Sequence, residues 1–146
     1  MKRFALVLIV ATVAACAGSQ SDRETLDETI RAYNEGMRWQ KFDAVAALRP
    51  PKERAQFVDD MDVRSKDLKI TEYDIVNVVA KGTREARVTV KLGWYRESEG
   101  ILKDTTSTQV WEKHGKTWLL VDETRARGDE MPGLAEAVKL EKPATK

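Results

Sequence analysis

The strongest constraint on the fold of this chain is an alternation of apolar and polar residues in its second half. Val88, Val90, Leu92 and Trp94 alternate with polar or small residues, as expected for a strand with one face toward a core. Comparable stretches separated by short turns predict strands at 68–80, 88–95, 101–112 and 117–123, and such a succession forms an antiparallel meander. The alternation shifts near Tyr73, which indicates either a β-bulge or a strand buried on both faces.

The first half of the chain has helical spacing instead. The apolar residues that share one face of the first expected helix are Leu26, Ile30, Tyr33 and Met37. We expect Ser21 or Asp22 to cap this helix, Asp43 to cap a short second helix, and Pro51 to begin a third. Helices followed by a meander predict an α+β fold, with the helices packed on one face of the sheet.

Two stretches resemble a known superfamily. The run 33–48 contains the pattern aromatic-x-x-Phe-Asp-Ala-x-x-Ala-Leu, and the run 109–122 combines an aromatic strand, a Gly-containing turn and a strand that starts with Trp. They resemble the helical start and the closing hairpin of the nuclear-transport-factor-2-like superfamily, which includes the ketosteroid isomerase-like proteins. The resemblance covers about residues 22–125. It implies a cone-shaped fold in which N-terminal helices close a curved antiparallel sheet around a pocket.

The first residues are typical of a secretory signal peptide. Residues 2 and 3 are basic and precede an apolar stretch at 4–13, which is too short to span a bilayer because a span takes about 20 apolar residues. Residues 13–16 are Val-Ala-Ala-Cys. This run resembles the bacterial lipobox, in which the leader is cut before the Cys and the Cys is acylated. Cys16 is the only cysteine, so the chain has no internal disulfide.

The lipobox resemblance implies a membrane anchor on Cys16 and a place in the cell envelope, since several acyl chains together hold a protein stably. Ala17 follows the Cys, whereas in such lipoproteins an Asp there favours the inner membrane. The resemblance therefore implies the periplasmic face of the outer membrane. The expected organisation is a signal peptide at 1–15, the lipidated Cys with a flexible tether at 16–21, one domain at 22–125, and a polar C-terminal tail at 126–146 with one short helix at 134–140.

Charge and composition exclude several kinds of site. The chain has 25 Lys+Arg and 24 Asp+Glu, a net charge of +1, whereas nucleic-acid-binding domains carry a strongly basic surface. We therefore expect no nucleic-acid partner. His114 is the only histidine, so a zinc site has no ligand set. We expect no metal and no cofactor.

Five aromatic residues are the candidate pocket residues: Tyr33, Trp39, Trp94, Trp111 and Trp118. Core packing is the competing interpretation, because large aromatic side chains dominate protein cores. Adjacent apolar residues at 110–111 and 118–121 point to both faces of the sheet. The face that the helices leave open would then meet a second copy of the chain in a homodimer, an envelope protein, or the C-terminal tail.

Three functions fit these features. We expect a membrane-anchored accessory or binding domain without catalysis. A small-molecule isomerase or hydratase is the alternative among enzymes, for which the resemblance implies an Asp base and an oxyanion hole of Tyr and a protonated Asp. The candidates for these roles are Tyr33, Asp74, Tyr95 and Asp122, and none lies in a matching motif. The third function is a structural lipoprotein that docks onto an envelope assembly through its sheet.

Overall fold

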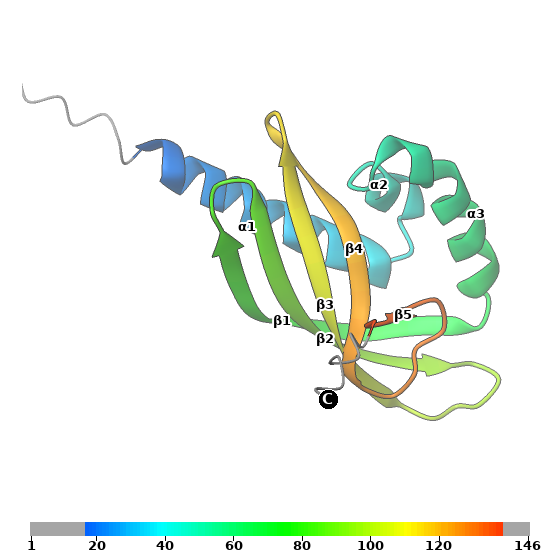
Figure 1. The fold of residues 1–146 in the computed structure, drawn as a ribbon. Coiled ribbons are helices and arrows are strands. Elements are labelled where there is room, and N and C mark those ends of the chain that lie inside the picture. Colours follow the sequence, from blue (N-terminus) through cyan, green and yellow to red (C-terminus); the bar gives the residue numbers. More distant parts are fainter. Residues whose placement is uncertain (1–16, 139–146) are drawn as a thin grey trace, which may run out of the picture.

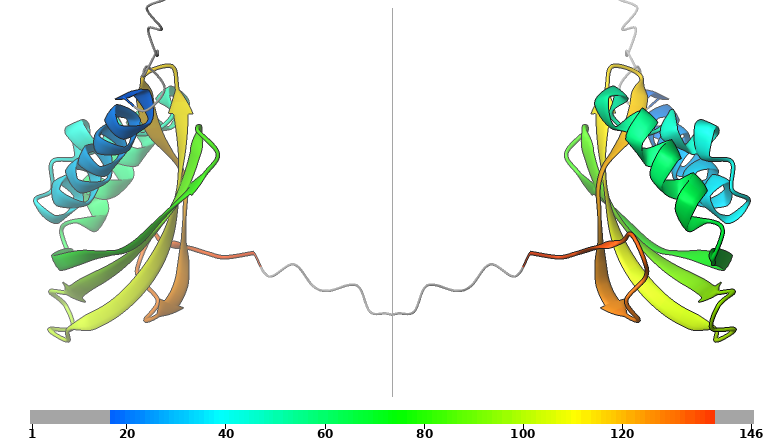
Figure 2. Two further views of the ribbon diagram at one scale, coloured as in Figure 1. Left: turned by 90° about the vertical axis from the view of Figure 1, so that its left-hand side faces the viewer. Right: turned by 90° about the vertical axis from the view of Figure 1, so that its right-hand side faces the viewer.

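The computed structural model describes residues 17–138. The helical elements come first: α1 (Ala17–Arg38), α2 (Phe42–Ala46), the 3-10 turn η1 (Pro51–Glu53) and α3 (Arg54–Arg64). The strands follow: β1 (Leu68–Lys81), β2 (Glu85–Arg96), β3 (Lys103–His114), β4 (Thr117–Gly128) and β5 (Ala135–Glu136). The strands lie in the order of the sequence, with β1 to β4 antiparallel and β5 parallel to β4. All three helices pack on one side of the curved sheet (Figure 1, Figure 2), which confirms the predicted α+β fold.

β1 curves because it contains two bulges. Its register against β2 shifts between Ile70 and Glu72 and again between Ile75 and Asn77. A bulge bends its strand and increases the local twist, and here it keeps Ile70, Tyr73 and Ile75 packed against the core. The shift of alternation near Tyr73 is therefore a bulge, one of the two alternatives that the sequence left open.

The core lies between α1 and the inner, concave face of the sheet. Ile30, Val88, Val90 and Trp111 have no solvent-exposed surface, so the alternation predicted for β2 places its apolar side chains inward. The core residues extend along the chain from Leu26 to the buried Met131. The buried core residues that the structure describes therefore all lie between Leu26 and Met131, a segment that residues 17–146 contain in full.

α1 begins earlier than the sequence predicted. Residues 17–21, expected to be part of a flexible tether, are helical, so neither Ser21 nor Asp22 is the first residue of the helix. The Asp22 carboxylate does not cap the helix, because it forms an ion pair with Lys113 Nζ at 2.6 Å. Thr25 Oγ1 donates a hydrogen bond to the Ser21 carbonyl at 2.8 Å, a pattern of helix interiors.

The C-terminal tail also differs from the prediction. β4 continues to Gly128 and Met131 belongs to the core, so the domain extends beyond residue 125. The helix expected at 134–140 is absent from its described part, 134–138, where Ala135 and Glu136 instead pair with β4. Pairing with the edge of β4 satisfies backbone groups that an isolated short helix would leave to water.

The outer face of the sheet is mostly polar. Across β2, β3 and β4, its large aliphatic side chains are Val110, which is half-buried, and Leu119, which is 7% exposed. Trp118 and Leu120 pair with inward-facing residues of β3, and a register shift at Val110 sets Val121 against the cavity described below. The apolar run at 118–121 therefore serves mainly the inner side. The homodimer or envelope partner on the outer face stays a prediction.

Candidate functional site: a cavity inside the cone

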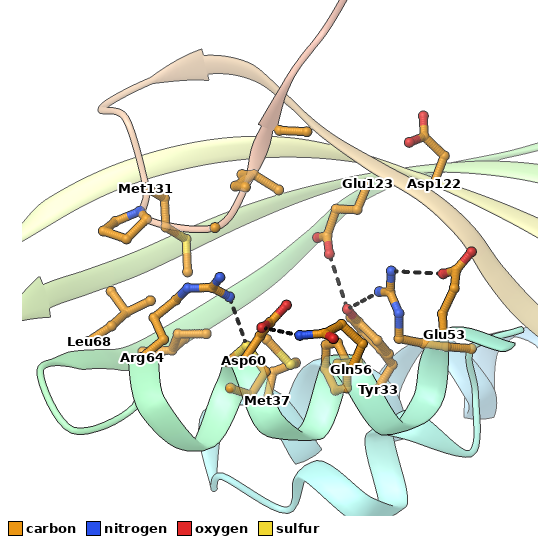
Figure 3. A pocket seen from close by; sticks show the side chains of 18 of the residues that line it. Tyr33, Met37, Glu53, Gln56, Asp60, Arg64, Leu68, Asp122, Glu123 and Met131 are labelled. Atoms are coloured by element: carbon orange, nitrogen blue, oxygen red, sulfur yellow. Dashed lines mark hydrogen bonds and ion pairs between the residues drawn. The ribbon is translucent and has the colours of Figure 1, made fainter. Parts of the chain in front are cut away.

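The concave side of the sheet encloses a cavity of about 480 Å³. Its walls are the sheet, the facing sides of α1 and α3, and the segment after β4 (Figure 3). Its apolar lining comprises Met37, Phe57, Met61, Leu68, Ile70, Leu92, Val121, Met131, Pro132 and Leu134. A concave space that combines apolar walls with convergent polar groups is the usual form of a small-molecule site.

The methionines gather at this cavity. The chain has four, and the three that follow Met1, which are Met37, Met61 and Met131, all line it. Methionine is unbranched and polarisable, and it adapts to apolar partners of different shape. The walls can therefore accommodate a ligand without a fixed outline.

The segment 129–136, here called the strap, closes one side of the cavity. Arg125 on β4 holds it: Nε and Nη2 donate to the Glu136 carboxylate at 2.6 and 2.9 Å, and Nη1 donates to the Gly128 carbonyl at 2.6 Å. Gly133 has a φ of 82°, and a Cβ there would overlap the guanidinium of Arg64 on α3. The strap thus packs closely against α3 at a position that only glycine fills easily.

Glu123 of β4 is one of four carboxylates that line the cavity, with Glu53, Asp60 and Asp122. Its Oε1 accepts hydrogen bonds from Ser107 Oγ and Gln109 Nε2, both at 3.0 Å, and its Oε2 accepts one from the Tyr33 hydroxyl at 3.2 Å. Burial, and then the nearby negative charge of Glu123, raise the pKa of Tyr33 well above its usual value. Tyr33 therefore stays protonated and remains a hydrogen-bond donor to Glu123.

Arg49 lies beside this pair. Its Nη1 donates to the Tyr33 hydroxyl at 3.3 Å, and its Nη2 contacts Glu53 Oε2 at 3.5 Å. The guanidinium also lies 4.8 Å from the ring centre of Phe57, a cation–π distance. Its Nε is buried and has no hydrogen-bond partner within residues 17–138. Arg49 thus supplies a partly desolvated positive charge next to the Tyr33 hydroxyl.

A second layer of buried amides holds Glu123 in place. Gln109 Nε2 also donates to Asn34 Oδ1 at 3.0 Å, and its Oε1 accepts a hydrogen bond from Trp111 Nε1 at 3.2 Å. Asn34 Nδ2 donates in turn to the Ile30 carbonyl at 2.8 Å. Gln109 and Asn34 are at most 2% exposed. A buried polar network whose members are satisfied makes its surroundings rigid.

This arrangement differs from the one that the isomerase resemblance implied. The Tyr33 hydroxyl points to Glu123 (Figure 3), so its proton is not directed at a ligand. Asp74 and Tyr95 both lie on the outer side of the sheet. Asp74 is exposed on β1, opposite Lys91 in the strand register, and Tyr95 lies on β2 opposite Lys69. Asp122 lines the cavity but is exposed. The four candidates are therefore not gathered into one acid–base site.

The aromatic candidates for the pocket also separate. Tyr33 lines the cavity. Trp94, Trp111 and Trp118 are at most 4% exposed and belong to the core, outside the cavity lining. Trp39 is 58% exposed, and its Nε1 donates to Glu35 at 2.6 Å. The three buried tryptophans follow the competing interpretation, core packing, whereas Trp39 lies on the surface because α1 ends just before it.

The sequence did not single out the polar residues of the site. Arg, Gln and Glu are common on protein surfaces, so residue type alone does not set Arg49, Gln109 and Glu123 apart. A usable signal was present in β3, since Ser107 and Gln109 alternate in phase with Trp111 and so point inward with it. Cys16 lies outside the described residues. Within residues 17–138, no helix is long and apolar enough to cross a bilayer, and no group of three potential ligands could hold a metal ion.

Comparisons with known proteins find similarity in fold and do not indicate the chemistry of the site. No family model matches the chain, and no curated protein matches it by sequence. A SEC-C motif containing protein from Rhodopseudomonas palustris superposes with a TM-score of 0.61 at 15% identity, over 77% of this chain and 90% of that one. A region of the chloroplast protein ARC6 from the intermembrane space superposes with a TM-score of 0.51 at 8% identity, over 70% and 94%.

A third structure carries the name of the superfamily that the sequence resembled. It is a ketosteroid isomerase-like protein from Erwinia carotovora atroseptica, with a TM-score of 0.55 at 12% identity, over 71% of this chain and 95% of that one. At such identities a likeness concerns the fold alone. The chain has the α+β fold of the nuclear-transport-factor-2-like, ketosteroid isomerase-like proteins.

Proposed function

We propose that this protein is a lipid-anchored protein of the bacterial cell envelope, on the periplasmic face of the outer membrane. Its domain binds a small, largely apolar molecule inside the cone and does not alter it chemically. The anchor is Cys16, on the strength of the lipobox-like residues 13–16. One of the proteins that share the fold, by its name, comes from an intermembrane space, so the fold is compatible with a compartment bounded by membranes.

The hydrogen bonds of Glu123 carry the proposal of binding without catalysis. Three donors occupy its carboxylate, and one of them is Tyr33, the hydroxyl that an isomerase would direct at its substrate. A general base must reach the proton that it removes, and Glu123 is engaged by the protein itself. The cavity offers a ligand apolar area and three adaptable methionines, and its lining also includes charged residues such as Lys52, Asp60 and Arg64.

A matched pair of variants on α3 tests this function in the domain 17–146. An uncharged naphthylamine dye, which fluoresces in apolar surroundings, should bind saturably to one site. Met61→Trp fills the cavity and should weaken binding about tenfold or more, which is about 1.4 kcal/mol. Val63→Trp adds the same ring to a residue that is 68% exposed and outside the lining, and should leave affinity unchanged.

Two results would contradict the proposal. One is the absence of saturable binding, with both variants shown to be folded by circular dichroism. The other is an equal loss of affinity in Met61→Trp and Val63→Trp, which would place the dye outside the cavity. Recovery of a chemically changed compound after incubation of the protein with extracted envelope lipids would favour the enzyme alternative.

A further inference from the structure

The tips of two hairpins lie at the end of the molecule where α1 begins. Lys113, next to the β3–β4 turn, forms an ion pair with Asp22 of α1 at 2.6 Å, and its backbone N–H donates to the Arg84 carbonyl in the β1–β2 turn at 2.8 Å. In Figure 2 the β3–β4 tip and the start of α1 lie at the top and the β1–β2 tip lies to the side below them, whereas the strap lies in the lower half. This end of the domain is therefore built from three separate segments.

The exposed charge at these tips is positive. Lys81, Arg84 and Lys116 are exposed, and no carboxylate within residues 17–138 lies within 4.0 Å of their charged groups. Within the two hairpins, Glu85 pairs with Arg87, and Glu112 Oε2 lies 3.3 Å from His114 Nε2. Lys81 and Arg84 line a cleft between the tips together with Lys113 and His114. The tips thus form a surface suited to anions, here called the basic tips (Lys81, Arg84 and Lys116).

The position of α1 fixes how far the basic tips are from the anchor. α1 is helical from Ala17, the residue after Cys16, and Asp22 follows five residues later. At 1.5 Å per residue this is about 7.5 Å of helix. Without a flexible tether between Cys16 and the domain, acyl chains on Cys16 would bring the basic tips to the headgroups, within about a Debye length of 8–10 Å.

We propose that the basic tips lie on the membrane and bind the phosphate groups of anionic phospholipids. The orientation on the membrane rests on the lipid anchor of the proposed function, whereas the contact of the basic tips with headgroups does not, and neither rests on the cavity. An acyl anchor with a basic patch is a stronger hold than either alone, and each basic side chain near an anionic surface contributes about fivefold to partitioning. The contact would orient the domain with α1 rising from the membrane and the strap on the far side.

Amine footprinting of the full lipidated chain on vesicles tests the orientation. An amine-reactive reagent should label Lys81 and Lys116 several-fold more slowly on vesicles of phosphatidylcholine with phosphatidylglycerol than on vesicles of phosphatidylcholine alone. High salt should remove the difference. Lys41 and Lys66 are matched exposed controls. Lys41 follows α1, whose 22 residues span about 33 Å, so its rate should not change. If the labelling rate of each of the four lysines is the same on both kinds of vesicle, the proposal is wrong.

Vesicle binding by the unanchored domain 17–146 separates this inference from the anchor itself. Lys81→Gln/Lys116→Gln should lower partitioning onto phosphatidylglycerol vesicles by about tenfold or more, while Lys41→Gln/Lys66→Gln, with the same change in charge, should not. If both double variants lower partitioning equally, only net charge matters and the inference is wrong. If the basic tips bind vesicles but Cys16 carries no lipid, the anchor is wrong and the headgroup contact stands.

Discussion

The Tyr33 hydroxyl on α1 donates a hydrogen bond to the Glu123 carboxylate on β4 at 3.2 Å, between residues 90 positions apart in the sequence. This contact ties the first helix to the last long strand at the polar end of the cavity. It also occupies the two groups that could otherwise act as an acid and a base. The same hydrogen bond therefore stabilises the cone and directs the Tyr33 proton at Glu123.

Tyr33→Phe should lower the free energy of unfolding by about 1–3 kcal/mol, because Glu123 loses a donor that its charge makes strong. The raised pKa of Tyr33 adds a dependence on alkaline pH. A raised folded-state pKa contributes stability that is fully present below about pH 10, the pKa of an unfolded tyrosine, and is lost as the pH rises toward the folded value. Urea unfolding across this range measures both effects.

The control for Tyr33 must account for Tyr73, whose pKa is also raised, by burial and then by the charge of Glu35. Tyr33→Phe should therefore reduce the alkaline loss of stability without abolishing it. Tyr95→Phe, at a half-buried position on the outer side, should change stability at neutral pH by less than about 0.5 kcal/mol. Equal losses in Tyr33→Phe and Tyr95→Phe would show that the contact with Glu123 contributes nothing.

Trp118→Ala should destabilise the domain by about 3–5 kcal/mol, the usual cost of removing a buried aromatic ring. Trp118 is 4% exposed in the core. Trp39→Ala removes the same ring from a residue that is 58% exposed and should cost less than about 1 kcal/mol. Chemical denaturation of both variants checks this pair, and a cost for Trp118→Ala below that of Trp39→Ala would be incompatible with its place in the core.

Cys16→Ser should abolish labelling of the protein by a radioactive fatty acid and leave it unprocessed or soluble. A serine hydroxyl does not replace the thiol that takes the lipid in the lipobox resemblance. Fractionation of cells that express the variant, with immunoblotting for size, provides the measurement. Normal cleavage together with normal partitioning into membranes would show that Cys16 is not the anchor.

Arg125→Gln should loosen the strap, because it removes the bidentate contact with Glu136. Arg125 is 21% exposed and Glu136 59%, so solvent screens the contact and its contribution to stability is small. Amides of the strap should then exchange with deuterium up to about fivefold faster. Arg127→Gln, an exposed position on the same strand, is the control, and equal rates in both variants would show that Arg125 does not hold the strap.

The fold could be predicted from the sequence because periodicity carries it. The alternation around Val88 and Val90 marks β2, and its shift near Tyr73 marks the bulge in β1. The start of α1 and the strap could not be predicted this way. Asp22 is a good helix cap locally, yet its partner is Lys113 on a distant hairpin, and Leu134 suits a helix locally, yet β4 offers an unpaired edge beside it.

The site was harder to predict than the fold, because its polar residues act through distant partners. Nothing local distinguishes Arg49 or Glu123 from surface charges. Their roles arise only when α1, the loop after α2 and β4 converge on Tyr33. The tryptophans attracted attention through their size, and size predicts burial in the core better than it predicts a place in a cavity.

The most direct test of the cavity uses its methionines as reporters. The domain 17–146 is labelled with 13C at its methionine methyl groups, and the three reporters Met37, Met61 and Met131 all line the cavity. The signal of an added initiator methionine is identified because it is absent from a sample from which that residue has been removed. Titration with the uncharged naphthylamine dye should shift all three signals along one saturation curve that matches the dye fluorescence. Dye fluorescence that saturates while the three methyl signals stay unchanged would contradict binding inside the cone.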